Sequence, residues 1–306
     1  MLSNEKLLST LQTSWHLPDA LVVQRLSGGF SSEVWKVEAG DQCFVVKYAY
    51  QSQEAFEGGL YAAELAEQYG IRSAAPLRTK EGALSTLVEG THGKHQPLAL
   101  LRFVAGEPLR LEEPGAAGLY GSLLGRTHRI FLKGGGEKVT FDVYDFLQAE
   151  DTSVTAQPAL ASLIHQTLQA TRAYETRRKV TTGMIWADRV EILHERETGH
   201  VGIIDWGAIE RGPLLFDVAL SVLWLFPEGS RMHEEFLQAY QAETPISVSE
   251  LEGLSYYKAL VWARQAKFFA YRVAANATRG SSHPDDNEQS FTEARQELER
   301  LLRDLS

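Results

Sequence analysis

Residues 201–207 read Val-Gly-Ile-Ile-Asp-Trp-Gly, a short apolar and β-branched run that ends at an acidic side chain. Such a run predicts a buried strand, and an aspartate directly after a strand has two ordinary roles. Its carboxylate either caps the following turn or, where a nucleotide lies alongside, coordinates Mg²⁺. Asp205 is therefore a candidate metal ligand, and the choice between the two roles depends on the rest of the chain.

A lysine lies in the middle of another apolar run, Phe44-Val45-Val46-Lys47-Tyr48. A buried ammonium group is costly unless its charge is paired or faces a binding site. One interpretation is an edge-strand lysine whose head reaches water. The other is a strand lysine that holds nucleotide phosphates, as in kinases. Just upstream, Gly28, Gly29 and Ser31 form a turn whose N–H groups can face a phosphate, although a plain hairpin turn has the same composition.

The order of the elements separates strands from helices. The N-terminal third is predicted to hold strands over 20–26, 33–37, 42–49, 84–88 and 98–104, with helices over 4–17 and 54–69. After Gly106 the pattern is mainly helical, with helices over 116–131, 158–175, 251–275 and 291–305 and one strand over 201–206. This segregation predicts an α+β protein with two lobes, not a doubly wound sheet.

Composition narrows the class of protein. The chain has 306 residues, 44% hydrophobic and 23% charged, which is the balance of a globular protein of about two domains. With 30 basic and 40 acidic residues its net charge is −10, which argues against a nucleic-acid partner. The one cysteine, Cys43, excludes an intrachain disulfide and is expected in the core. The start lacks a signal-peptide pattern and Val218–Phe226 is too short to span a bilayer, so we expect a cytoplasmic protein with no membrane partner.

Two further motifs complete an ordered series. The run Leu101-Arg102-Phe103-Val104-Ala105-Gly106 precedes the 201–207 stretch, and Gly212-Pro213-Leu214-Leu215-Phe216-Asp217 follows it. We expect Asp217, which lies inside an apolar helical run, to be a buried hydrogen-bond acceptor that orients a nearby loop. With the glycine turn and the strand lysine, this series resembles the aminoglycoside phosphotransferase and choline-kinase-like family of small-molecule kinases.

A helix of the second half carries the same resemblance. Residues 121–128 read Gly-Ser-Leu-Leu-Gly-Arg-Thr-His, which is similar to the family's Gly-x-x-Leu-Ala-x-Leu-His. Gly121, Leu124 and His128 match the family pattern, while Gly125 and Thr127 depart from it. We expect His128 to be a structural histidine with its hydrogen bonds satisfied.

The resemblance implies a fold, a cofactor and a set of residues. The fold is a bilobal protein-kinase-like one, with a small antiparallel-sheet N-lobe over residues 1–104 and a larger, mainly helical C-lobe over residues 105–306. The cofactor is ATP, or another nucleoside triphosphate, with Mg²⁺. By the resemblance Lys47 takes the α- and β-phosphates, Asp205 takes the metal, and the hinge around Phe103 binds adenine. The remaining residues of this set are those of the phosphate-facing turn, Gly28, Gly29 and Ser31.

The chain departs from the family in the catalytic loop, which in the family reads His-Gly-Asp-x-x-x-x-Asn. The corresponding stretch, counted back from the strand that leads into Asp205, begins Thr182-Gly-Met-Ile-Trp-Ala-Asp-Arg. Met184 therefore stands at the position of the catalytic Asp, and Arg189 at that of the metal-binding Asn. A thioether does not usefully accept a proton from a hydroxyl. Arginine contacts phosphates but does not coordinate Mg²⁺.

Two assignments stay open. An alternative alignment makes Asp188 the substitute base, at the cost of a leucine in the Asn position. The partner of Lys47 is Glu57 or Glu64, which both lie on the predicted helix 54–69. The family's spacing falls near Gly59, which favours Glu57, and two solvated helix charges are an equal alternative.

The sequence leaves two functions open. One is ATP-dependent phosphoryl transfer to a hydroxyl or amine of a small molecule, and the net charge of −10 is compatible with a cationic acceptor. Since phosphoryl transfer depends mainly on positioning and charge neutralisation, loss of the base need not abolish it. The other is a catalytically inactive pseudokinase, a nucleotide-binding or regulatory module in which Arg189 takes the place of the metal. The sequence decides neither between them nor on an oligomeric state.

Overall fold

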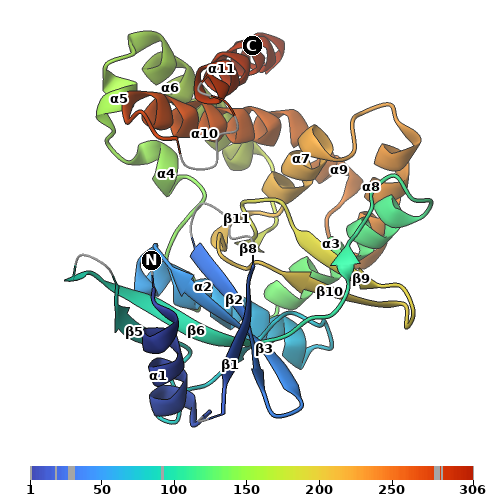
Figure 1. The fold of residues 1–306 in the computed structure, drawn as a ribbon. Helices are drawn as coiled ribbons and strands as arrows, with labels where there is room; N and C mark the ends of the chain where they lie inside the picture. The colour runs from blue at the N-terminus through green and yellow to red at the C-terminus, as the bar shows by residue number, and fades with distance from the viewer. Residues whose placement is uncertain are drawn as a thin grey trace. The chain divides into compact units, whose positions relative to one another are not determined.

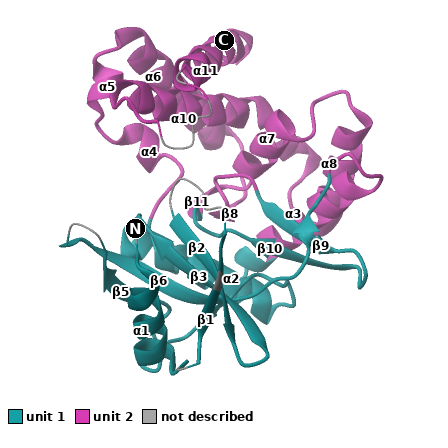
Figure 2. Ribbon diagram, in the orientation of Figure 1, with its two compact units in different colours: residues 1–110, 130–140, 190–209 teal, residues 111–129, 141–189, 210–306 magenta. Residues whose placement is uncertain are grey.

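The computed structural model describes residues 2–17, 19–26, 32–90, 93–278, 283 and 285–305. They form two compact units, which Figure 2 shows in different colours. The first comprises residues 1–110, 130–140 and 190–209, and the second comprises residues 111–129, 141–189 and 210–306. The units therefore interleave along the chain. The continuous division between residues 104 and 105 stays a prediction of the sequence.

An antiparallel sheet forms the centre of the first unit (Figure 1). Its strand order is β1-β2-β3-β6-β4, with β5 also paired to β6. The strands are β1 (Leu21–Leu26), β2 (Ser32–Ala39), β3 (Gln42–Ala49), β4 (Pro76–Leu77), β5 (Thr86–Glu89) and β6 (His95–Arg102). A tight turn joins β2 to β3 at Gly40, whose φ of 59° is left-handed and costs glycine no strain.

The two faces of this sheet have different neighbours because successive side chains of a strand point to opposite faces. Phe44, Val46 and Tyr48 of β3 belong to a core cluster with helix α1 (Asn4–Trp15). Val45 packs on the opposite face, in a cluster with helix α2 (Gln53–Gln68). Lys47 shares the face of Val45, so the alternation of β3 turns the lysine toward the side of the sheet that α2 covers.

A smaller sheet completes the first unit. Its order is β10-β9-β7, all antiparallel, with bounds β7 (Glu107–Pro108), β9 (Glu191–Glu195) and β10 (His200–Ile204). A short 3₁₀ helix, η2, covers Gly136–Lys138. In the register of β9 and β10, Glu191 lies opposite Ile204, the residue directly before Asp205. Asp205 therefore leaves the sheet beside Glu191.

The second unit is mainly helical. It contains all but the last two residues of α3 (Ala116–Phe131). Its other elements are α4 (Asp145–Gln148), α5 (Thr152–Thr155), α6 (Pro158–Arg177), β8 (Thr182–Ile185), β11 (Glu210–Pro213), α7 (Leu215–Trp224), α8 (Arg231–Glu243), α9 (Val248–Leu251), α10 (Leu254–Ala274) and α11 (Asp286–Leu305). Helix α10 packs against α6, α7 and α11, and β8 pairs with β11. In the described part of the chain, no helix is both long and apolar enough to cross a membrane.

The departure from the family at Gly125 has a packing reason. A Cβ at Gly125 would lie 2.7 Å from the carbonyl oxygen of Tyr240 on α8, and one at Gly121 would lie 2.3 Å from that of Phe236. Both distances are too short for any side chain, so α3 and α8 approach each other through these two glycines. An alanine at position 125, as in the family pattern, would force the helices apart.

The predicted α+β class is confirmed, with an antiparallel sheet in the N-terminal region and helices through most of the rest. One expectation about the core is wrong. Cys43 lies at the start of β3 and is only half-buried, with its Sγ 3.7 Å from Oε1 of Glu38. Cys43 is the third residue after the turn at Gly40, where the strand still borders solvent. The thiol is therefore only partly covered, whereas the apolar run that follows it is buried.

Candidate nucleotide pocket

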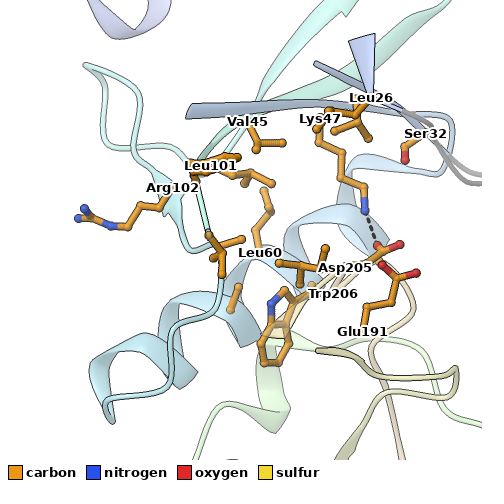
Figure 3. Close-up of a pocket in the computed structure, with 18 of the residues that line it drawn as sticks. Leu26, Ser32, Val45, Lys47, Leu60, Leu101, Arg102, Glu191, Asp205 and Trp206 are labelled. Carbon is orange, nitrogen blue, oxygen red and sulfur yellow. Dashed lines mark hydrogen bonds and ion pairs between the residues drawn. The ribbon is translucent and has the colours of Figure 1, made fainter. Parts of the chain in front are cut away.

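A pocket of about 250 Å³ opens beside the central sheet of the first unit. All its lining residues belong to that unit, and they come mainly from strands β1, β2, β3, β6 and β9, helix α2, and the segments that follow β6 and β10 (Figure 3). Its walls are mostly apolar, and the charged side chains among them include Lys47, Glu191 and Asp205. An apolar slot with a few convergent charges is typical of a ligand site.

Lys47 points into this pocket and is paired there. Its Nζ lies 2.5 Å from Oδ1 of Asp205. The lysine side chain is only 11% exposed and the aspartate side chain 46% exposed, so the ammonium group is the more desolvated partner. The pair compensates the cost of burying the lysine, and its more exposed carboxylate stays accessible to the pocket. The structure thus brings together the two residues on which the sequence prediction mainly rests.

The backbone at Asp205 is held in an uncommon conformation. Its φ is 58°, a left-handed value that few residues other than glycine adopt. The next residue, Trp206, is buried, and its indole N–H donates to the carbonyl oxygen of Ser73 at 2.6 Å. A Cβ at Gly59 of α2 would lie 1.9 Å from the Trp206 carbonyl oxygen. Hence α2 lies directly against this segment, and the packing around Trp206 fixes where the carboxylate points.

Neither predicted glutamate partner of Lys47 is found beside it. Glu57 accepts a hydrogen bond from Ser85 Oγ at 2.6 Å and another from Gln53 at 3.0 Å. Glu64 pairs with Arg78 at 2.6 Å. The helix position nearest the family spacing is Gly59, which has no room for a side chain. The packing of α2 against Trp206 is the reason that no carboxylate of this helix reaches the lysine.

The expected hinge also borders the pocket. Phe103 and Val104 line it, directly after β6 ends at Arg102. The ring of Phe103 is 40% exposed, and Nζ of Lys36 lies 5.3 Å from its centroid. The turn of the predicted site, Gly28, Gly29 and Ser31, lies outside the described residues. Ser32, the first described residue after it, lines the pocket.

The degenerate catalytic stretch, residues 182–189, belongs to the second unit and begins on β8. Met184 lies on that strand and is fully buried. Asp188 and Arg189 are both exposed, and the Arg189 N–H donates to Oδ1 of Asp188 at 2.7 Å. The thioether at the position of the family's base is therefore a core side chain. The two polar residues after it are turned to solvent.

A buried carboxylate holds this loop, as the sequence predicts for Asp217. Its two oxygens accept the N–H groups of Trp186 at 2.7 Å and Ala187 at 3.0 Å. Oδ2 also lies 3.0 Å from Nε2 of His128, whose Nδ1 is 2.9 Å from the Tyr240 hydroxyl. Asp217 and His128 are both almost fully buried. The structural roles predicted for these two residues are confirmed, and the loop keeps its anchor although its reactive residues are changed.

The sequence does not single out Glu191, because residues 182–193 resemble a loop motif and no strand is predicted at β9. The signal was present as alternation: Val190 and Ile192 are buried, whereas Glu191 and Leu193 line the pocket. Among the described residues, no group of three or more His, Cys, Asp or Glu side chains is arranged to hold a metal ion. A cation in the pocket would therefore need ligand oxygens from a nucleotide as well as from the protein.

Three solved kinases are similar to the chain over nearly their whole length. The amicoumacin kinase hAmiN, in complex with AMP-PNP, Ca²⁺ and Ami, has 14% sequence identity and a TM-score of 0.73, covering 98% of this chain and 94% of that one. The microcompartment-associated aminopropanol kinase has 14% identity and a TM-score of 0.74, covering 99% and 98%. The choline kinase LicA from Streptococcus pneumoniae has 14% identity and a TM-score of 0.66, covering 97% and 98%. No curated protein matches the chain.

At this level of identity the structural likeness establishes the fold, which is protein-kinase-like as predicted. The family is established by sequence. The profile of the phosphotransferase enzyme family (APH) matches residues 22–251, which is most of the chain and runs from before Lys47 to beyond Asp217. The predicted resemblance is confirmed, and the chain belongs to the phosphotransferase enzyme family.

Proposed function

We propose that the chain binds a nucleoside triphosphate with Mg²⁺ in the pocket of its first unit and transfers the terminal phosphoryl group to a hydroxyl or amine of a small molecule. The single observation that carries the proposal is the Lys47–Asp205 pair at 2.5 Å inside a mostly apolar pocket. An ammonium group and a carboxylate at this distance suit the two charges of a metal–nucleotide complex, since the lysine attracts phosphate and the carboxylate attracts the cation.

The lining residues of the pocket support this proposal for each part of the nucleotide. The apolar side chains of Val34, Val45 and Leu101 offer a surface for a base, next to the hinge at Phe103. The ammonium group of Lys47, in the same lining, suits the α- and β-phosphates. The exposed oxygen of Asp205 is a hard ligand of the kind that Mg²⁺ takes alongside phosphate oxygens, so the donor set fits the metal. When bound, Mg²⁺ supplies charge neutralisation on the phosphates.

The residues of the catalytic loop limit what this chain can contribute to the transfer. Met184 is buried and carries no basic atom, so it does not accept the proton of an acceptor hydroxyl. Asp188, the substitute base of the alternative alignment, is exposed and keeps a carboxylate. Because positioning and charge supply most of the rate in phosphoryl transfer, the proposal predicts a slow enzyme, not an inert one.

The second candidate is a nucleotide-binding regulatory module without turnover. Burial of Met184 and the exchange of the metal-binding Asn for Arg189 favour it. In this alternative the Arg189 guanidinium contacts phosphate in place of a metal. The two candidate functions differ in whether the protein needs the divalent cation. Turnover needs the cation, whereas the regulatory module binds nucleotide equally well without it.

For the acceptor we propose a cationic small molecule such as an amino alcohol. The excess of 40 acidic over 30 basic residues favours a cation. Two of the structural neighbours are by name an aminopropanol kinase and a choline kinase. A cytoplasmic location is part of the same proposal, because the one cysteine and the nucleotide cofactor suit that compartment.

The test is nucleotide binding by calorimetry, with a non-hydrolysable ATP analogue and Mg²⁺. We expect Lys47→Met, which keeps the apolar stem and removes the charge, to weaken binding roughly 10- to 150-fold, the equivalent of about 1.5–3 kcal/mol for a hydrogen bond to a charged group. Lys80→Ala is the matched control, because the Lys80 side chain is exposed, pairs with Glu81 and lies outside the pocket.

Turnover is then measured as ADP release on a panel of amino alcohols and aminoglycosides. A wild-type rate above that of Lys47→Met supports the enzyme. Nucleotide binding without acceptor-dependent ADP release on the whole panel would favour the regulatory module. Failure of the wild-type protein to bind the analogue at all would reject both.

A further inference from the structure

The pocket holds a second carboxylate that the family's loop pattern does not provide. Glu191 is the first residue of β9, and the register of the sheet pairs it with Ile204 of β10. Asp205 follows Ile204 directly, so the two acidic residues leave neighbouring strands at the same end. Both line the pocket, and Figure 3 draws both side chains below the Lys47 ammonium group in that view.

The pleat of β9 directs Glu191 to this place. Val190 and Ile192, on either side of it, are buried. Glu191 and Leu193 share the other face and line the pocket, as residues two apart in a strand do. An apolar residue at position 191 would extend the apolar wall that Leu193 and Ile204 form. The sequence instead puts a charge there, in the lining that also holds Asp205 and Lys47.

We infer that Glu191 is the second protein ligand of the cation in this pocket, and that it supplies the oxygen which the family takes from the Asn replaced here by Arg189. The inference rests on the proposed function. Mg²⁺ and Mn²⁺ in nucleotide sites are held by one or two carboxylates together with phosphate oxygens and water. Asp205 gives one carboxylate, its Oδ1 being occupied by Lys47, and Glu191 gives the other.

The charges of the pocket make nucleotide binding dependent on the cation. Lys47 contributes one positive charge, and Asp205 and Glu191 contribute two negative ones, while Arg102, which also lines the pocket, pairs with Glu67. The carboxylate of Glu191 repels a polyphosphate that carries no metal. A divalent cation between the carboxylate and the polyphosphate attracts both of them. Glu191 therefore weakens binding of the bare nucleotide and strengthens binding of its metal complex. The ratio of the two affinities measures its role.

The experiment measures the affinity of the full chain for a non-hydrolysable ATP analogue by calorimetry, once with Mn²⁺ and once with EDTA. For the wild-type protein we expect tight binding with Mn²⁺ and weak binding with EDTA. For Glu191→Gln we expect the ratio of the two affinities to fall at least about tenfold. Changing even a residue that only supports a metal ligand typically lowers metal affinity by at least this factor. Binding with Mn²⁺ becomes weaker and binding with EDTA becomes tighter.

Glu195→Gln is the matched control on the same strand. Glu195 pairs with Arg72 and Thr198 outside the pocket, so this variant should keep the wild-type ratio. Thermal unfolding of all three proteins checks that each is folded.

Each other outcome counts against the inference in its own way. An unchanged ratio in Glu191→Gln, with the analogue still bound, overturns the role of Glu191 and leaves the proposed function intact. Equal loss of affinity in both conditions means that Glu191 contacts the nucleotide and not the cation, and also overturns it. A wild-type protein that binds equally well with EDTA overturns it in favour of the regulatory module. A wild-type protein that binds in neither condition rejects the inference and the proposed function together.

Discussion

Lys47 and Asp205 are 158 positions apart in the chain, yet their charges meet in one pocket. Each is visible in the sequence because it interrupts or ends an apolar run, which makes its burial costly without a partner. The pairing itself is not visible, since it depends on how closely α2 approaches the backbone of Trp206. That approach depends on Gly59, where a side chain would collide with the Trp206 carbonyl oxygen.

Two neighbouring glycines of α2 therefore predict opposite effects of the same substitution. At Gly58 the nearest atom to an added Cβ is 3.6 Å away, which is an ordinary contact. We expect Gly58→Ala to raise the free energy of unfolding by roughly 0.5–1 kcal/mol, the helix-propensity difference. At Gly59 the nearest atom is 1.9 Å away. We expect Gly59→Ala to lower the free energy of unfolding by about 1–3 kcal/mol through overpacking.

Urea denaturation of both variants and of the wild-type protein measures the two changes in the free energy of unfolding. Because the two positions are adjacent in one helix, each variant is the control for the other. Equal effects at both positions would mean that α2 does not lie against Trp206 as closely as the structure has it.

At the scale of elements, an ion pair joins α10 to β11 in the second unit. Arg264 donates to both carboxylate oxygens of Glu210, at 2.9 and 2.7 Å, and also to the carbonyl oxygen of Val143. Both side chains of the pair are largely buried, at 15% and 17% exposure. Burial raises the pKa of Glu210 above its ordinary value, against the opposing effect of Arg264. The stability of this contact therefore depends on pH.

Arg264→Met should make that dependence pronounced. Without the guanidinium the pKa of Glu210 rises further, so the folded protein keeps a proton that the unfolded chain, with its ordinary value of 4.5, has lost. Unfolding then releases a proton, and the stability falls as pH rises above 4.5 until it reaches the folded pKa, by up to about 1.4 kcal/mol per pH unit. We expect a loss of about 3–5 kcal/mol relative to the wild-type protein near neutral pH.

Urea denaturation at a series of pH values between 5 and about 8 gives the profile. The double variant Glu210→Gln with Arg264→Met is the control, because it has no carboxylate to titrate at this site. It should recover stability and lose the pH dependence of the single variant. A flat profile for Arg264→Met alone would show that Glu210 reaches water in the folded protein.

At the scale of the whole molecule, the sequence predicted the long periodic elements well and the short ones poorly. Helix α3 begins and ends where the spacing of its apolar residues predicts, at Ala116 and Phe131. The strands β8, β9 and β11 have four or five residues and mixed composition, so they carry too few periods to be recognised. Because β9 is not predicted, the sequence does not place Glu191 on a strand that faces the pocket. The stretch after β8 can be interpreted only from its resemblance to a motif.

The interleaving of the two units leads to a prediction about fragments of the chain. Residues 1–110 contain the central sheet and α2, but residues 130–140 and 190–209 complete the same unit. Gly58 and Gly59 pack against the backbone of Lys138 and Trp206, and β7 has its pairing partner in β9. An N-terminal fragment would expose the face of α2 that these segments cover. It would also leave Lys47 without Asp205.

We therefore expect the fragment 1–110 not to unfold cooperatively on its own, although the predicted lobe 1–104 is nearly the same length of chain. Thermal unfolding by circular dichroism, compared with the full chain, measures this. Addition of a separate peptide covering residues 190–209 should restore part of the cooperativity, because it returns Asp205, Trp206 and the β9–β10 pair. A fragment with a sharp transition close to that of the full chain would instead support a continuous N-terminal domain, and the approach of residues 190–209 would then be secondary to its folding.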